Sequence, residues 1–336
     1  YGFNVLTKAG IHVVLGFLEE AEPWRLRSSQ FPSKVGGKPA WLSQRGLPSG
    51  SELECEVCRL PMVFLLQVYA PISGQDRSFH RTLFLFCCKT PECYSRSDSR
   101  CMKVFRSQLS RKNEFYPYEP PPEENHDVFT ISGVKLCWVC GCPGNKACSR
   151  CHGVTYCGKH HQTLHWKQSH RRECCKVETS ADTTSPLLFS ESELVTEPEE
   201  DIIKLIFIYF TLIADLEEMA MHETEDNKTF QQFKKKTSSE PHQVIRYSRG
   251  GRPLWVSSQH VPSDEDILPC TCGAKRIFEF QVMPQLLNSL SVDSTGASID
   301  WGTLAIYTCT DSCNHDDRYY REFIWKQDFT SDQNAD

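Results

Sequence analysis

The sequence lacks the features that would place it in a membrane or among the common enzyme classes. Its most apolar run, residues 202–213, contains Lys204 and is shorter than the roughly 20 apolar residues of a membrane-spanning helix. The first residues show no basic stretch followed by an apolar core and a cleavage site, so we expect no secretory signal. No G-x-S-x-G motif and no phosphate-binding Gly-Lys-Ser/Thr occurs, and nothing places two carboxylates as an acid/base pair. The sequence therefore predicts an intracellular protein that is not an enzyme.

The charges are distributed unevenly along the chain. The net charge is −6, but residues 1–116 carry +6, residues 137–176 carry +6, and residues 177–229 carry −12. The acidic stretch is typical of a solvated linker, and the alternative is that it screens the two basic parts.

Cysteine, by contrast, is abundant, with 18 residues among 336. A disulfide scaffold is typical of a short secreted chain with a signal peptide. Here the cysteines form close pairs with histidines nearby, a pattern that favours zinc in a reducing compartment.

One segment carries four such pairs in succession. A C-x2-C knuckle lets two thiolates reach one ion, and ligands at i and i+4 lie on one face of a helix. In a cross-brace, alternate pairs share an ion, which predicts two full tetrahedral zinc sites with structural roles. The predicted ligands of the first site are Cys137, Cys140, Cys157 and His161, and those of the second are Cys148, Cys151, His170 and Cys174. This arrangement resembles a finger of the MYND type, which implies that the segment binds proteins.

Other residues compete for these places. Cys142 and Cys175 adjoin predicted ligands and are interpreted as spare thiols, and only spacing argues against His160 and His165.

Two outer sets of cysteines flank the finger. They are Cys55, Cys58, Cys88 and Cys93, and then Cys270, Cys272, Cys309 and Cys313. Each set has two thiol pairs on neighbouring predicted strands and could hold a further zinc ion, or could consist of buried free thiols. Cys87 competes with Cys88, and Cys101 competes with Cys93.

The chain also repeats itself. Each half has a cysteine knuckle, a strand, a returning strand with a second cysteine pair, and a third strand. Gln67 and Gln281 each lie nine residues after a knuckle, and Gln108 and Gln327 lie 15 and 14 residues after Cys93 and Cys313. We expect a mainly β fold with some helix, in which two related halves pack into one barrel-like or sandwich body, because a lone three-stranded unit has unprotected edges.

Composition shifts divide the chain into five parts. Residues 11–116 form the N-terminal half of the split β domain, 117–133 a proline-rich linker, and 134–176 the finger. Residues 177–210 form an acidic flexible linker, and 211–330 the C-terminal half.

With these residues laid out, the chain resembles the programmed cell death protein 2 family of MYND-finger proteins. The resemblance rests on the finger and on specific stretches such as PWRLRSSQFPSKVGGKPAWL (23–42), RKNEFYPYEPP (111–121) and CGAKRIFEFQVMPQLL (272–287). Residues 1–10 and 202–213 depart from it. It implies a split barrel-like domain with an inserted finger, in a protein of cytoplasm and nucleus.

The resemblance also implies a function. It points to a dedicated chaperone of a newly made small-subunit ribosomal protein, of the universal S-five family, in 40S ribosome biogenesis. The alternative is a transcriptional co-repressor adaptor, linked to apoptosis and proliferation, whose finger grips a proline-rich peptide near Trp166. We expect a monomer with protein partners, and no membrane or nucleic-acid ligand, although the finger carries +6.

Overall fold

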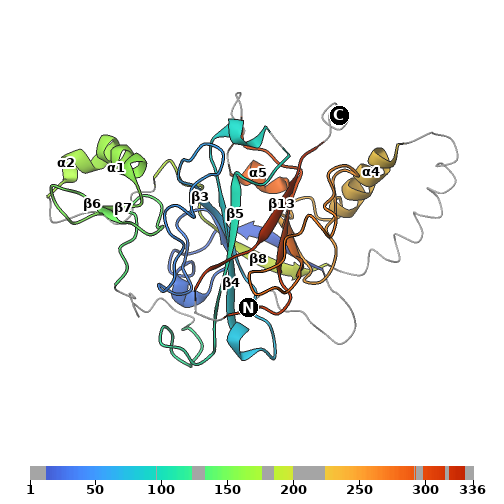
Figure 1. Cartoon of the computed structure of the whole chain (residues 1–336), viewed down its shortest axis with the longest axis horizontal. Helices are drawn as coiled ribbons and strands as arrows, with labels where there is room; N and C mark the ends of the chain where they lie inside the picture. Colours follow the sequence, from blue (N-terminus) through green and yellow to red (C-terminus); the bar gives the residue numbers. More distant parts are fainter. Residues whose placement is uncertain are drawn as a thin grey trace.

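The computed structural model describes residues 13–95, 97–122, 133–175, 185–199, 224–290, 292, 298–314 and 318–329. The expectations for residues 1–10 and 202–213 lie outside these ranges. The described chain forms a mainly β body, with the finger projecting on one side and helix α4 lying on the opposite side (Figure 1). None of its described helices combines the length and apolarity needed to cross a bilayer.

One sheet of 11 strands forms the body. Its order is β12-β5-β4-β3-β2-β8-β1-β9-β10-β11-β13, and its paired strands are antiparallel. The strands are β1 (Val14–Glu19), β2 (Lys34–Val35), β3 (Val63–Tyr69), β4 (His80–Cys87), β5 (Met102–Leu109), β8 (Ser192–Pro198), β9 (Ile245–Tyr247), β10 (Arg276–Val282), β11 (Thr303–Cys309), β12 (Tyr320–Arg321) and β13 (Phe323–Gln327).

Helices are few and short. Outside the finger, the described helices are the 3-10 turns η1 (Ser28–Gln30), η2 (Asp76–Ser78) and η3 (Pro91–Tyr94), with α4 (Glu225–Thr237) and α5 (Gln285–Ser289). Helix α4 begins at a capping residue, Thr224, whose hydroxyl accepts from the backbone N–H of Asn227. Its Phe233 packs against Val256 and Met283 at one end of the second half.

The two halves repeat one another, as the sequence predicts. Strands β3, β4 and β5 form an antiparallel meander, and so do β10, β11 and β13. The first strand of each meander carries a β-bulge, at Leu65 and at Glu279. Both bulged residues lie seven positions after a knuckle cysteine, so the irregularity itself is duplicated.

The sheet almost closes on itself. Strand β12 pairs with β5 of the first half, while β13 pairs with β11 of the second half. Glu322 lies between these two strands, and its backbone N–H donates to the carbonyl of Val104 at 3.0 Å. The large buried cluster inside includes Phe64, Phe84 and Trp301. The result is a nearly closed, barrel-like sheet.

Strands β1 and β8 form an antiparallel ribbon that joins the halves. Leu18 opposes Leu194, which is buried, and Phe17 opposes the half-buried Val195. Strand β8 lies within the segment 177–210, for which the composition predicts a flexible linker. For residues 192–198 this expectation is wrong, because pairing with β1 and β2 satisfies the backbone despite the acidic side chains.

Candidate metal centres

The finger is built around two small elements. A hairpin of β6 (Lys146–Ala147) and β7 (Thr155–Tyr156) is followed by α1 (Lys159–His165), a π-helical turn η4 (Trp166–His170) and the short α2 (Arg171–Glu173). The structure brings the predicted ligands together in the interleaved order. The first cluster is Cys137, Cys140, Cys157 and His161, and the second is Cys148, Cys151, His170 and Cys174. In each cluster the ligating atoms lie within 4.8 Å of one another.

The spacing within the finger fits a tetrahedral ion. A Zn–S bond of about 2.3 Å places two thiolates of a tetrahedral site about 3.8 Å apart. The sulfurs of Cys140 and Cys157 are 3.8 Å apart, and Cys137 Sγ lies 3.6 Å from Nδ1 of His161. In the second cluster, Cys151 Sγ lies 3.5 Å from Nε2 of His170. The two histidines thus present different ring nitrogens.

Backbone N–H groups favour the thiolate form of two knuckle cysteines, Cys148 and Cys58. Burial alone would raise the pKa of Cys148, but the N–H groups of Cys151 and Arg150, together with the His170 and Cys151 side chains, lower that pKa to about 6. Burial would also raise the pKa of Cys58. The backbone N–H of Leu60 and the nearby thiols outweigh this effect and lower the pKa of Cys58 to about 7. Thiolates are the form that binds zinc.

The neighbouring residues left open by the sequence take other places. The ring of His165 stacks on Trp138, and its Nδ1 lies 3.0 Å from the hydroxyl of Tyr156, so it belongs to the core of the finger. His160 is exposed. Neither Cys142, which is buried, nor the exposed Cys175 belongs to a described cluster.

The outer cysteines also gather into two clusters. These are Cys55, Cys58, Cys88 and Cys93, and Cys270, Cys272, Cys309 and Cys313. Among the competing residues, the clusters contain Cys88 and Cys93, whereas Cys87 and Cys101 are buried elsewhere in the core. Burial raises the pKa of Cys101 to about 12.

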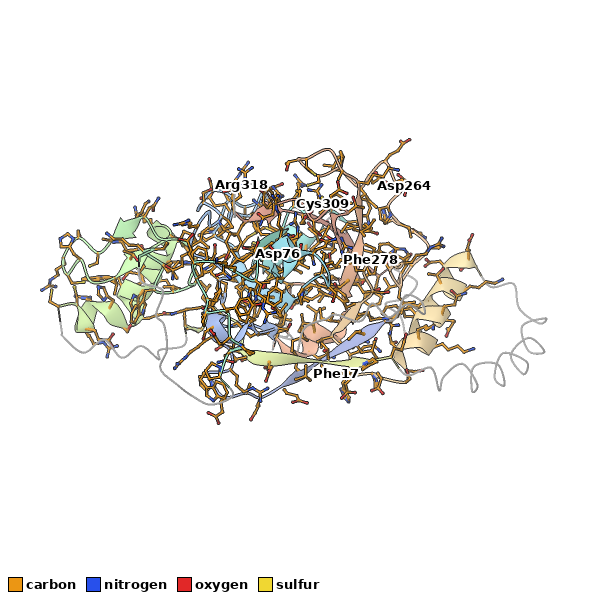
Figure 2. The ribbon with its side chains drawn as sticks, turned by 90° about the horizontal axis from the view of Figure 1, so that it is seen from below. Phe17, Asp76, Asp264, Phe278, Cys309 and Arg318 are labelled. Atoms are coloured by element: carbon orange, nitrogen blue, oxygen red, sulfur yellow. The ribbon has the colours of Figure 1, made fainter. Side chains whose placement is uncertain are left out.

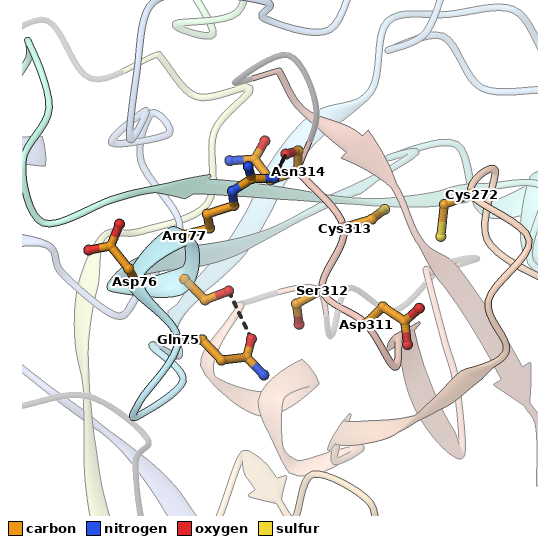
Figure 3. Close-up of a pocket in the computed structure, with 9 residues that line it drawn as sticks. Gln75, Asp76, Arg77, Cys272, Asp311, Ser312, Cys313 and Asn314 are labelled. Carbon is orange, nitrogen blue, oxygen red and sulfur yellow. Dashed lines mark hydrogen bonds between the residues drawn. The ribbon is translucent and has the colours of Figure 1, made fainter.

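A cleft of 670 Å³ opens beside the C-terminal cluster. One wall comes from the turn η2 between β3 and β4, including Asp76 and Arg77, and the other from the loop Asp311–Asn314. Figure 3 shows Cys272 and Cys313 at the edge of this space. The cleft therefore lies between the two halves, and both contribute to it.

A loop of the first half holds the finger against the barrel. The indole Nε1 of Trp41 donates to the carbonyl of Gly141 at 2.8 Å, and the ammonium of Lys38 lies over the ring of Trp138 at 5.5 Å. Gly141 has φ +70°, and a Cβ there would lie 2.8 Å from Lys38 Cβ. The finger and the barrel thus meet too closely for a side chain at this position.

We did not predict this docking loop, although the sequence contains a signal for it. Residues 36–41 read GGKPAW and residues 250–255 read GGRPLW. Gln67 bonds both backbone groups of Ala40, and Gln281 bonds both backbone groups of Leu254. The two equally spaced glutamines therefore anchor equivalent loops.

Comparisons with known proteins give these clusters a family. Models of the N-terminal domain of programmed cell death protein 2, of the MYND finger and of the C-terminal domain of the same protein match residues 12–123, 137–174 and 227–328. The chain is 50% identical to "Programmed cell death protein 2" of Bos taurus over 337 residues, covering 94% of this chain and 96% of that one. This chain belongs to the programmed cell death protein 2 family.

More distant relatives widen the picture. "Programmed cell death protein 2-like" of Mus musculus is 26% identical over 320 residues, covering 84% of this chain and 85% of its own length. "Probable 20S rRNA accumulation protein 4" of Schizosaccharomyces pombe is 34% identical over 98 residues, or 26% of this chain and 24% of its own length. No solved structure matches the chain. The family models that match describe a zinc finger and two domains that are not named for any enzyme.

Proposed function

We propose that this chain is a zinc-binding protein-interaction factor that acts as a dedicated chaperone of a small-subunit ribosomal protein of the universal S-five family in 40S ribosome biogenesis. Within this proposal the finger holds two zinc ions, each through three cysteines and one histidine, and catalyses nothing. The observation that carries the ribosomal part is the similarity to a fission yeast protein named for 20S rRNA accumulation.

The β1–β8 ribbon offers a surface suited to such a client. Residues 14–22 and 191–199 contain seven glutamates and no lysine or arginine. Ion pairs engage Glu191, Glu193 and Glu199 with Lys34, Arg25 and Arg246. The remaining four glutamates, Glu19, Glu20, Glu22 and Glu197, are exposed. A basic ribosomal protein would be attracted to this surface, and the half-buried pair Phe17–Val195 would add apolar contact.

The test is a pull-down of the tagged full chain from nuclease-treated cell extract, at physiological and at high salt, with mass spectrometry. We expect one free small-subunit ribosomal protein without whole ribosomes. The quadruple variant E19Q/E20Q/E22Q/E197Q should recover at least about tenfold less of this ribosomal protein. The variant lacks four negative charges that would attract a basic partner and speed its association. A matched control is D264N/E265Q, since Asp264 lies far from Phe17 in Figure 2.

A second candidate is the co-repressor adaptor, in which the finger binds a proline-rich peptide. It is favoured by Trp166, which is half-buried on η4 and whose ring meets His170 edge-on at 5.9 Å. Recovery of co-repressor components alone would replace the chaperone proposal with this one. In a parallel pull-down from untreated extract, recovery of nucleic acid alone, lost steeply with salt, would contradict both.

A further inference from the structure

The barrel itself contains two four-thiol clusters outside the finger. In the first half, sulfur–sulfur distances are 3.8 Å for Cys55–Cys93, 3.5 Å for Cys58–Cys88 and 3.8 Å for Cys88–Cys93. These distances are far longer than a disulfide bond of about 2.05 Å. They match the edge of about 3.8 Å expected for thiolates around a tetrahedral zinc ion.

The second half repeats this arrangement. The sulfurs of Cys270 and Cys313 are 3.5 Å apart, and those of Cys272 and Cys309 are 3.6 Å apart. In both halves one pair precedes the bulged strand, and the other pair begins at or just after the end of the returning strand. Four free thiols would have no reason to meet twice at the same point of a duplicated unit, whereas the ligands of a metal centre that joins a knuckle to a hairpin would.

The second cluster is supported by a residue of the first half. The guanidinium of Arg106, on β5 of the first half, reaches across to the second cluster: its Nη2 lies 3.7 Å from Cys313 Sγ, and its Nη1 donates to the Cys313 carbonyl at 3.0 Å. Glu322 holds this guanidinium, accepting from Arg106 Nε at 2.6 Å, and also accepts from the backbone N–H of Cys309 at 3.3 Å. Both Arg106 and Glu322 have fully buried side chains.

We propose that the barrel holds two further zinc ions, one in each four-cysteine cluster, and that Arg106 of the first half positions the ligands of the C-terminal centre. Each ion fastens a knuckle to its hairpin. The C-terminal centre additionally joins the halves, because Arg106 on β5 of the first half contacts the loop that carries Cys313. Groups behind metal ligands typically change metal affinity 10–100-fold when they are removed.

Metal content and ligand type together test the two centres. The full chain, purified without chelator, should contain four zinc ions. Zinc X-ray absorption should give an average of 3.5 sulfur ligands, since two sites with three cysteines and one histidine are averaged with two sites of four cysteines. The double variants C55S/C58S and C270S/C272S should each lose one zinc ion. The control C101A, which removes a thiol outside the clusters, should retain four. Two zinc ions per chain with three sulfur and one nitrogen ligand would overturn the proposal, because only the finger would then be filled.

A second measurement tests Arg106 as a positioning residue. In cadmium-substituted protein, R106M should shift or abolish the ¹¹³Cd resonance of one four-cysteine site and leave that of the other unchanged. Release of one zinc ion to a chelator should become 10–100-fold faster, and R106K should rescue it in part. The control is K326M, because Lys326 is another fully buried cation, on β13, and its partner is Asp328. Equal effects of R106M and K326M on metal release would reduce Arg106 to a structural role.

Discussion

Arg81 on β4 and Glu279 on β10 form an ion pair in the interior of the barrel, although 198 positions separate them in the chain. Both side chains are fully buried, and Arg81 Nη2 donates to Glu279 Oε2 at 2.7 Å. The hydroxyls of Tyr247 and Thr308 also donate to this carboxylate. The pair therefore joins the first half of the sheet to the bulge of the second.

Removing one partner of this pair should be costly. We expect R81M and E279Q each to lower the free energy of unfolding by about 3–5 kcal/mol, because a buried charge or its donors lose their partner. The double variant R81M/E279L should cost less than the sum, as urea denaturation would measure. The exposed pair Arg100–Asp98 is the control, and R100Q should leave the free energy of unfolding almost unchanged, because solvent screens exposed ion pairs. Additive costs for Arg81 and Glu279 would contradict direct coupling.

The imidazole of His80 should remain neutral at pH values well below the ordinary pKa of histidine. Burial, assisted by the nearby charge of Arg111, lowers the pKa of His80 to about 4. Its ring stacks on Phe31 with centroids 4.1 Å apart, and its Nδ1 lies 3.0 Å from the hydroxyl of Tyr69.

The sign follows from the unfolded value of about 6.5. Between pH 6.5 and about 4 the unfolded chain binds this proton and the folded chain does not, so stability falls as pH falls through that window. Below about 4 no further loss comes from this group. An NMR titration of ¹³C-labelled histidines, assigned with H80Q, should place its midpoint near 4. A midpoint near 6.5 would show that the ring is open to water.

Gly141 should tolerate no side chain. G141A places a methyl group against Lys38 Cβ at a backbone angle of +70°, so it should separate the finger from the barrel or cost more than about 1 kcal/mol. Quenching of Trp41 fluorescence by iodide should increase, since the indole would lose its bond to residue 141. The matched control is G158A in the same finger, where the added methyl group meets nothing within 4 Å. Equal behaviour of the two variants would argue against the docked arrangement.

Loss of a finger ligand should unfold the finger alone. C157S should lose the zinc of the finger and the partners that bind the folded finger, because metal binding supplies the folding free energy of such small domains. C142S should keep the zinc ions of the finger and its partners, since Cys142 lies outside the clusters. Zinc content and the NMR signals of α1 would report each change. A C142S variant that lost metal while C157S kept it would reverse the ligand assignment.

Local spacing predicted the repeat and the cysteine clusters, because the two cysteines of a knuckle lie only a few residues apart in the sequence. One match in the repeat was misaligned. Thr82 opposes Ser107 and Thr303 opposes Gln327, and both threonines lie six residues before the cluster cysteine that follows β4 or ends β11. Gln327 therefore corresponds to Ser107 rather than to Gln108.

Long-range pairings could not be predicted in this way. Nothing near Ser192–Pro198 indicates that a glutamate-rich segment will pair with Val14–Glu19, because the reason lies in a strand about 180 residues earlier. The Arg81–Glu279 pair could not be predicted from the sequence either, since a single arginine and a single glutamate carry no periodic signal. The ligands of the predicted sites and the five boundaries stay predictions until metal and domain experiments test them.

The position of the closing strands has a consequence for synthesis in the cell. Strands β12 and β13, at residues 320–327, complete the sheet and are synthesised after all the other described strands. Until then β5 has an open edge. One edge of β2 is likewise unpaired until β8 is made, after the finger. A nascent chain of this protein therefore carries unpaired strand edges until these strands are made, and such edges favour pairing with other chains.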